Sequence, residues 1–406
     1  MSHAVTIEQL NHQVQRMNKR LAEQDQRFRI NGYATFGIAQ SDEAVSYNNV
    51  SDEVDFRRFA RAGIQMTFNV NKQSSVVTQL VSRGENDFNT NMEWAYYRHQ
   101  FNSEWSGKIG RIRAPYYMLS EYLDVGYAVP WAQMPAETYS QLSTFANVDG
   151  IDLTWDTEVA EYGLQVQGIY GKTTTDDFIV KDLYSVGVTL LSDEWSIRMA
   201  TAGANLTANT GVQGQIVLAG DSLYGNGSGS QAGSFASLSF RYDPGDMLVM
   251  GEYTASEVDG VLADQSSIFM TFGYRFNQWM PHITYSFHES DDNSDRVLPT
   301  SIPSGTDLTS SEVPTGTIPD LNGNGTSNEA GDLAALLNAS NNAEAIRIGL
   351  GVRYDLSAGV ALKLQYDMVD ASDVGLYDFQ NYLAAQGAGK APDKVNILTF
   401  TIDTVF

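Results

Sequence analysis

The feature that most constrains this chain is a two-residue alternation of apolar and polar side chains, which recurs in short segments from Phe28 to the last residue, Phe406. One clear segment carries its apolar side chains at Ile268, Met270, Phe272, Tyr274 and Phe276. A period of two puts neighbouring side chains on opposite faces of a β-strand. The pattern therefore predicts an all-β fold of strands that each have one apolar and one polar face.

The connections between these segments alternate in length. Seven short ones fall near 71–74, 102–104, 156–158, 192–194, 243–246, 277–278 and 355–359. Eight longer ones fall near 41–58, 84–91, 114–147, 171–180, 205–233, 256–266, 289–344 and 370–393. Fifteen connections join about sixteen strands of about ten residues, which is the length of a tilted strand that crosses a bilayer. An even number of strands brings both ends of the barrel to the side of the short turns.

Aromatic residues mark one end of the predicted strands. They flank six of the seven short turns, at Phe101, Trp105, Trp155, Trp195, Tyr242, Phe276, Trp279 and Tyr354. Such rings lie at the headgroup level of a bilayer, whereas a soluble sandwich has no reason to collect them at one end. No apolar run approaches the roughly 18 residues of a membrane helix. The sequence therefore favours a membrane β-barrel, and Phe406 falls in the same aromatic ring.

The last strand, VNILTFTIDTVF, resembles the assembly signal of Gram-negative outer-membrane proteins. With the strand number and the long third loop after GKIGRIRAPYY, residues 28–406 are similar to the trimeric porin family. The resemblance implies a 16-stranded antiparallel transmembrane β-barrel in a Gram-negative outer membrane. It also implies a homotrimer in contact with lipid and lipopolysaccharide, with the third loop, at about 114–147, folded into the barrel.

Residues 1–27 have a different pattern. Apolar residues spaced alternately by three and four form a heptad seam at Ile7, Leu10, Val14, Met17 and Leu21. This spacing predicts a coiled-coil arm, with a single amphipathic helix lying on its own domain as the alternative. The arm is similar to the periplasmic coiled coil of DcaP-like porins. The strand count places it in the periplasm.

The charge of the chain and that of the predicted lumen differ. The net charge of −24 argues against nucleic-acid binding. If the apolar parity faces lipid, the basic residues that face inward are Arg61, Arg98, Arg198, Arg241, Arg275, Arg347, Arg353 and Lys363. The inward acids are fewer, namely Asp152, Asp367 and Glu252. A charge excess of one sign sets ion preference, although each arginine alone could belong to a structural ion pair.

The third loop is the predicted constriction of the pore. Arg111 and Arg113 lead into it, and it carries the acids Glu121 and Asp124. Acids on the loop that face arginines on the wall would set up a field across the pore and align small polar solutes. Tyr116, Tyr117 and Tyr122 either fix the loop to the wall or form a stacking track for sugars.

A possible calcium loop lies in the segment 289–344. Its oxygen-bearing residues alternate as in an EF-hand, at Asp320, Asn322, Asn324, Thr326 and Asn328, with Gly325 sixth. The twelfth position is Gly331 instead of Glu, with Asp332 one residue later, so we expect weak affinity; an ordinary Asn-Gly turn loop is the alternative. No other cofactor is expected.

These features predict a porin, which is a water-filled channel for passive diffusion of small hydrophilic solutes, leaning to anions. The alternatives are a channel selective for sugars or dicarboxylates and a non-conducting structural or adhesive barrel. An enzyme is not expected, because His99, His282 and His288 lie in no recognisable catalytic string.

Overall fold

The computed structural model describes residues 27–209, 217, 230–260, 262–290, 343–373 and 392–406. The predicted coiled-coil arm and the predicted calcium loop lie outside these residues. Among the described residues, no helix is both long and apolar enough to cross a membrane.

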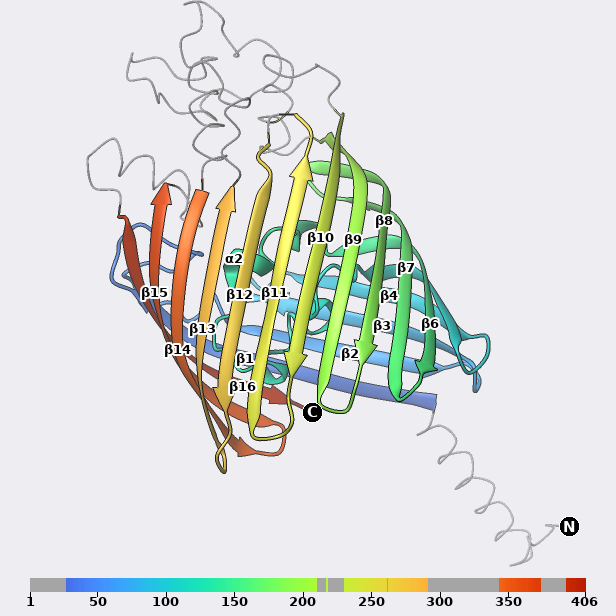
Figure 1. Ribbon diagram of the computed structural model, residues 1–406, viewed down its shortest axis with the longest axis horizontal. Coiled ribbons are helices and arrows are strands. Elements are labelled where there is room, and N and C mark those ends of the chain that lie inside the picture. The colour runs from blue at the N-terminus through green and yellow to red at the C-terminus, as the bar shows by residue number, and fades with distance from the viewer. Residues whose placement is uncertain (1–26, 210–216, 218–229, 261, 291–342, 374–391) are drawn as a thin grey trace, which may run out of the picture.

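The described residues form a closed antiparallel barrel of sixteen strands (Figure 1), as the alternation pattern predicts. The first eight strands are β1 (Phe28–Ser41), β2 (Arg61–Asn69), β3 (Ser74–Arg83), β4 (Thr90–Gln100), β5 (Trp105–Arg113), β6 (Asn147–Val159), β7 (Tyr162–Thr174) and β8 (Phe178–Leu191). The others are β9 (Trp195–Ala208), β10 (Ser230–Tyr242), β11 (Met247–Val258), β12 (Gln265–Tyr274), β13 (Trp279–Ser290), β14 (Ala343–Ser357), β15 (Val360–Asp373) and β16 (Lys394–Val405).

The two faces of the strands match the predicted polarity. In β12, Ile268, Met270 and Phe272 are 36–55% exposed on the outside, whereas Phe269 and Thr271 are buried inside. Aromatic rings pack together at the short-turn end: Trp105 and Trp155 are stacked with centroids 5.9 Å apart, and Trp279 and Tyr354 are tilted with centroids 4.5 Å apart. The barrel therefore presents an apolar outer face with an aromatic band at one end.

The barrel closes between its first and last strands. β1 pairs with β16 from Tyr33↔Val405 to Ser41↔Ile397. Beyond this ladder, the backbones of Gly32 and Phe406 exchange two hydrogen bonds, of 2.7 and 2.9 Å. A Cβ at Gly32 would come within 2.4 Å of the Phe406 ring, so a larger residue there would displace this exposed terminal ring.

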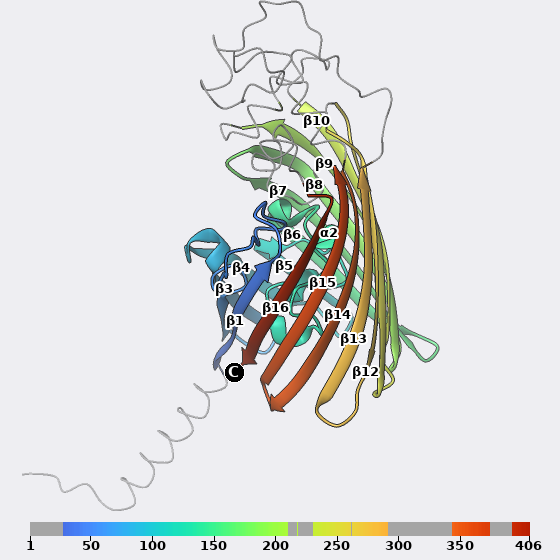
Figure 2. The same ribbon diagram turned by 90° about the vertical axis from the view of Figure 1, so that its left-hand side faces the viewer.

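Two long connections fold into the lumen. The third loop, between β5 and β6, contains η2 (Ser120–Tyr122), η3 (Gly126–Ala128), α2 (Ala136–Tyr139) and η4 (Ser143–Phe145), and it lies inside the barrel (Figure 2). The first connection, residues 42–60, also packs inward: Tyr47 and Val50 are fully buried in a cluster with Val395 and Ile397 of β16. No period or motif in the sequence indicates this second inward fold.

Candidate functional site

The third loop leaves β5 and crosses the lumen to the opposite wall. Arg198 of β9 donates to the backbone oxygen of Pro115 at 2.8 Å, and Ser237 of β10 donates to that of Tyr116 at 2.7 Å. Glu252 of β11 accepts from the backbone N–H of Met118 at 2.8 Å. These bonds fix the first turn of the loop against three adjacent strands.

The tyrosines of the loop divide into two groups. Tyr116 and Tyr117 are 3% exposed and pack edge-to-face with Phe235 of β10, with ring centroids 5.8 and 5.4 Å apart. Edge-to-face pairs of this kind stabilise packing, so these two rings fix the loop to the wall. Tyr122, in contrast, is 51% exposed, and its ring faces the open lumen.

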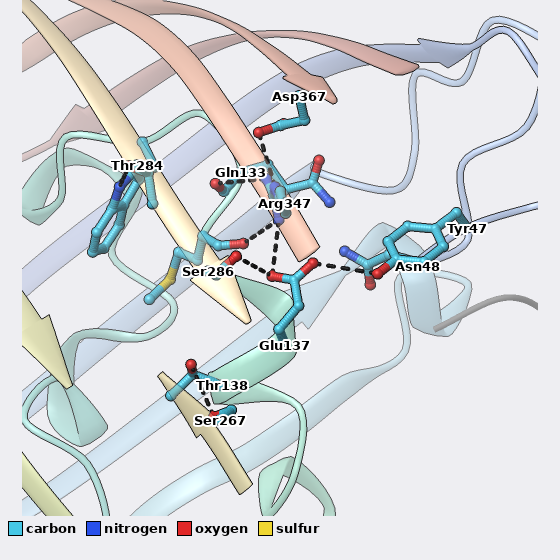
Figure 3. A network of polar contacts seen from close by, with 12 residues as sticks. Tyr47, Asn48, Gln133, Glu137, Thr138, Ser267, Thr284, Ser286, Arg347 and Asp367 are labelled. Atoms are coloured by element: carbon cyan, nitrogen blue, oxygen red, sulfur yellow. Dashed lines mark hydrogen bonds and ion pairs between the residues drawn. The ribbon is translucent and has the colours of Figure 1, made fainter. Parts of the chain in front are cut away.

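A buried polar network centred on Glu137 of α2 joins both inward-folded loops to the wall (Figure 3). The Glu137 carboxylate accepts from the Tyr47 hydroxyl at 3.3 Å and from the Ser286 hydroxyl at 3.0 Å. It also lies 3.5 Å from the Arg347 guanidinium, which donates to Asp367 at 2.8 Å. Glu137 and Tyr47 are fully buried, so the network holds the two loops together across the lumen.

A second clamp holds the middle of the loop against β15 and β16. Lys363 donates to the backbone oxygens of Gly126 and Trp131 at 2.6 and 2.9 Å and pairs with Asp403 at 2.9 Å. A Cβ at Gly126 would lie 2.0 Å from a carboxylate oxygen of Asp403. Only glycine allows the loop to approach the wall this closely.

An ionic cluster holds the tip of the loop against β2–β5. Arg83 contacts both oxygens of Asp124 at 2.7 Å and pairs with Glu93 at 2.7 Å. Arg113 lies 3.1 Å from Glu93, and Arg61 lies 3.9 Å from Asp124. Burial alone would raise the pKa of Asp124, but the hydrogen bonds and charge of Arg83, with the charges of Arg113 and Arg61, hold this pKa at about 2.

The eight predicted lumenal cations all lie on the inner face, but most of them hold the loop. Arg61, Arg198, Arg347, Arg353 and Lys363 donate to backbone oxygens of the third loop. The remaining inward cations are Arg98, which lines the lumen, and Arg241 and Arg275, which share Asp243 at the short-turn end. The expected field between loop acids and free wall arginines is thus largely replaced by direct ion pairs.

The prediction that Arg111 faces the constriction is wrong. Arg111 shares a strand face with Ile109, which is 58% exposed on the outside, and it pairs with Asp149 at 3.4 Å on that same outer face. Arg113 reaches the lumen because it is the last residue of β5, where the chain turns inward into the loop. Parity places both residues on the face of Ile109, so the inward position of Arg113 comes from the turn into the loop.

Several inner charged residues were missed in the sequence, namely Arg83, Glu93, Lys108 and Asp403. Glu93 sits at a register shift opposite Gln79 and Leu80, and this bulge turns its side chain inward. Asp403 shares the inward parity of Thr399 and Thr401, so its position could have been inferred from the pattern of the last strand.

The lumen contains a polar chamber of about 650 Å³ between the third loop and the short turns. Its cations are Arg98, Lys108, Arg198 and Arg241. Lys108 lies 3.5 Å from Asp152 and 3.7 Å from Glu121. Within the described part of the chain, Arg98 and Arg198 have no carboxylate within 4 Å, so the chamber keeps unpaired positive charge.

No family model and no curated protein matches the chain. Solved structures do match it in fold. OmpT, an outer membrane protein of Vibrio cholerae in trimer form, aligns with a TM-score of 0.56 at 11% identity, over 93% of this chain and 99% of that one. An anion-selective porin from Comamonas acidovorans aligns with a TM-score of 0.56 at 13% identity, over 93% and 99%. The outer membrane channel DcaP of Acinetobacter baumannii aligns with a TM-score of 0.52 at 12% identity, over 93% and 97%. The chain therefore shares the 16-stranded barrel fold of outer-membrane porins.

Proposed function

We propose that this protein is a passive channel of a Gram-negative outer membrane that admits small hydrophilic solutes and prefers anions. The observation that carries the proposal is the chamber, in which Arg98 is exposed to the lumen and Arg198 is buried in the wall, and neither has a carboxylate within 4 Å among the described residues. Unpaired cations at a narrow passage raise the local concentration of anions.

The outer surface supports a place in a membrane. The outward side chains of the strands are largely apolar, and aromatic rings gather at the short-turn end. Such an apolar band bordered by aromatic residues fits a bilayer. The fold shared with outer-membrane porins supports the outer membrane, with the short turns and the arm on the periplasmic side.

One outward ion pair supports assembly into a homotrimer. Arg111 lies six residues along β5 from Trp105 of the aromatic band. At about 3.3 Å per residue and a tilt near 45°, this places it roughly 14 Å into an apolar band about 25 Å tall. A charged side chain facing lipid near the midplane costs about 2–4 kcal/mol. The Arg111–Asp149 pair is better accommodated against a second copy of the chain.

Conductance across a planar bilayer tests the proposal. Reversal potentials in a KCl gradient should show anion preference, and Arg98→Ser should reduce it by about half, since one of the two unpaired cations of the chamber is removed. Glu121→Gln should increase anion preference, because Lys108 loses one neighbouring carboxylate. Arg111→Ser should leave the reversal potential unchanged, because this side chain is outside the barrel. Strong cation selectivity of the wild type would refute the anion preference, and absence of conductance would leave a structural barrel.

A further inference from the structure

We propose that the chamber is a binding site for a polyhydroxylated organic anion of the sugar-acid class. This inference rests on the proposed channel function and names the solute that the chamber retains. It follows from the combination of cations that lack a carboxylate partner with a wall that carries amide and carboxylate oxygens, which an anion without hydroxyl groups would not need.

The anionic group of the solute meets positive charge on two sides of the chamber. Among the described residues, Arg98 of β4 donates a single long 3.4 Å bond, to Gln100, and its guanidinium is exposed to the lumen. Arg198 of β9 donates through its two terminal nitrogens to Thr189 and Pro115, so it contributes its charge from within the wall. Guanidinium groups bind carboxylates with charge-assisted hydrogen bonds, which are the strong ones.

The rest of the wall offers acceptors. Gln165 and Gln167 each donate one amide N–H, to Asp156 and Asp152 at 2.8 and 2.6 Å, so each amide keeps its carbonyl oxygen and a second N–H group. Glu121 and Asp156 add carboxylate oxygens. These acceptors repel an anion that has nothing to donate, but hydroxyl groups satisfy them. The wall therefore favours an anion that also carries several hydroxyls.

Two aromatic rings complete the site. Tyr122 lines the chamber from the third loop and is half exposed. Tyr96 of β4 lines it from the barrel wall, and the Lys108 ammonium lies 5.7 Å from the centroid of the Tyr96 ring. Sugar rings present C–H edges that pack on such aromatic faces, with an apolar surface buried on contact. A volume of about 650 Å³ holds one such monomer with its water.

Single-channel block tests the site in the full-length protein. Glucuronate added on the short-turn side should interrupt the chloride current in a saturable way, at a concentration at least tenfold below that needed for acetate, glucose or serine. Acetate tests charge alone, glucose tests hydroxyls alone, and serine tests a zwitterion. Equal block by acetate and glucuronate would overturn the proposal, as would stronger block by glucose or serine.

Variants locate the site. Arg98→Gln should weaken glucuronate block about tenfold, the effect of losing one charge-assisted hydrogen bond, and Asp156→Asn should narrow the preference for glucuronate over acetate. Lys172 is exposed on the outer face, where it pairs in register with Asp149. Lys172→Gln should therefore change neither the strength of glucuronate block nor the preference for glucuronate over acetate. Glucuronate block that survives Arg98→Gln and Asp156→Asn unchanged would place binding elsewhere. An anion-selective pore without preferential glucuronate block would refute this inference alone, whereas loss of anion selectivity in the wild type would refute the proposed function.

Discussion

At the scale of single residues, the lumen shows how one carboxylate can organise two loops. Glu137 contacts a hydroxyl from residues 42–60, a hydroxyl of β13 and a guanidinium of β14, and all of these groups are buried. Removing one member of a buried ionic network leaves its partner charge uncompensated, which costs more than the network itself contributes. Glu121, 51% exposed on the same loop, has only a distant contact with Lys108.

We predict that Glu137→Gln destabilises the loop while Glu121→Gln does not. The amide keeps the shape of the side chain but removes the charge that faces Arg347, so we expect a loss of about 1–3 kcal/mol. The measurements are the temperature at which the detergent-solubilised barrel unfolds and the noise of its open-channel current. Equal stability of both variants would show that the network around Glu137 does not hold the loop.

At the scale of elements, the third loop is held by clamps of different chemistry along its length. Backbone acceptors and aromatic packing hold its beginning, Lys363 holds its middle, and α2 is held through Glu137. The tip depends on the ion pair between Asp124 and Arg83, at 2.7 Å. The response of this ion pair to pH follows from the pKa of Asp124, which lies in the loop itself.

We predict that the tip stays attached down to about pH 4 and is released only in stronger acid. The pKa of Asp124 is lowered from 3.8 to about 2, so its stabilising contribution is fully present above pH 4 and is lost as the pH falls through 2. Between pH 7 and pH 2, the part of the conductance and current noise that Asp124→Asn removes should change only in the last two pH units. Asp124→Asn should show the acid form of the current already at pH 7. A transition near pH 6 that Asp124→Asn leaves unaltered would assign the response to another group.

At the scale of the whole molecule, the outer surface is not uniform. Most of it is apolar, but β5 and β6 carry the Arg111–Asp149 pair at a depth where lipid accommodates charge poorly. A subunit interface formed by β5 and β6 is compatible with the coiled-coil arm predicted ahead of β1, because both would join copies of the chain. Three heptads are marginal as an isolated coil, so we expect the barrel contact and the arm to act together.

We predict that deleting residues 4–27 leaves a folded barrel with a weaker trimer. The barrel closes from Gly32 onward without the arm, whereas the coil would add contacts between subunits. Light scattering in mild detergent and the unfolding temperature of the barrel separate the two properties. Monomeric full-length protein under these conditions would contradict the homotrimer, and an unfolded deletion variant would contradict the independence of the barrel.

The sequence by itself determined the barrel, because a period of two, the alternation of short and long connections and the aromatic residues near the turns are local properties that a strand expresses wherever it lies. It also determined that Arg98, Arg198 and Lys363 face inward, since their parity follows from the same pattern. Only the tertiary structure decided which of these cations bind the third loop and which stay exposed to the lumen. Whether a cation of the wall meets solvent or a backbone oxygen depends on how the third loop and residues 42–60 fold across the lumen. The contact between Lys363 and Gly126, for example, joins residues 237 positions apart. The outward position of Arg111 and the inward position of Glu93 depended likewise on where a strand ends or bulges, which alternation does not encode.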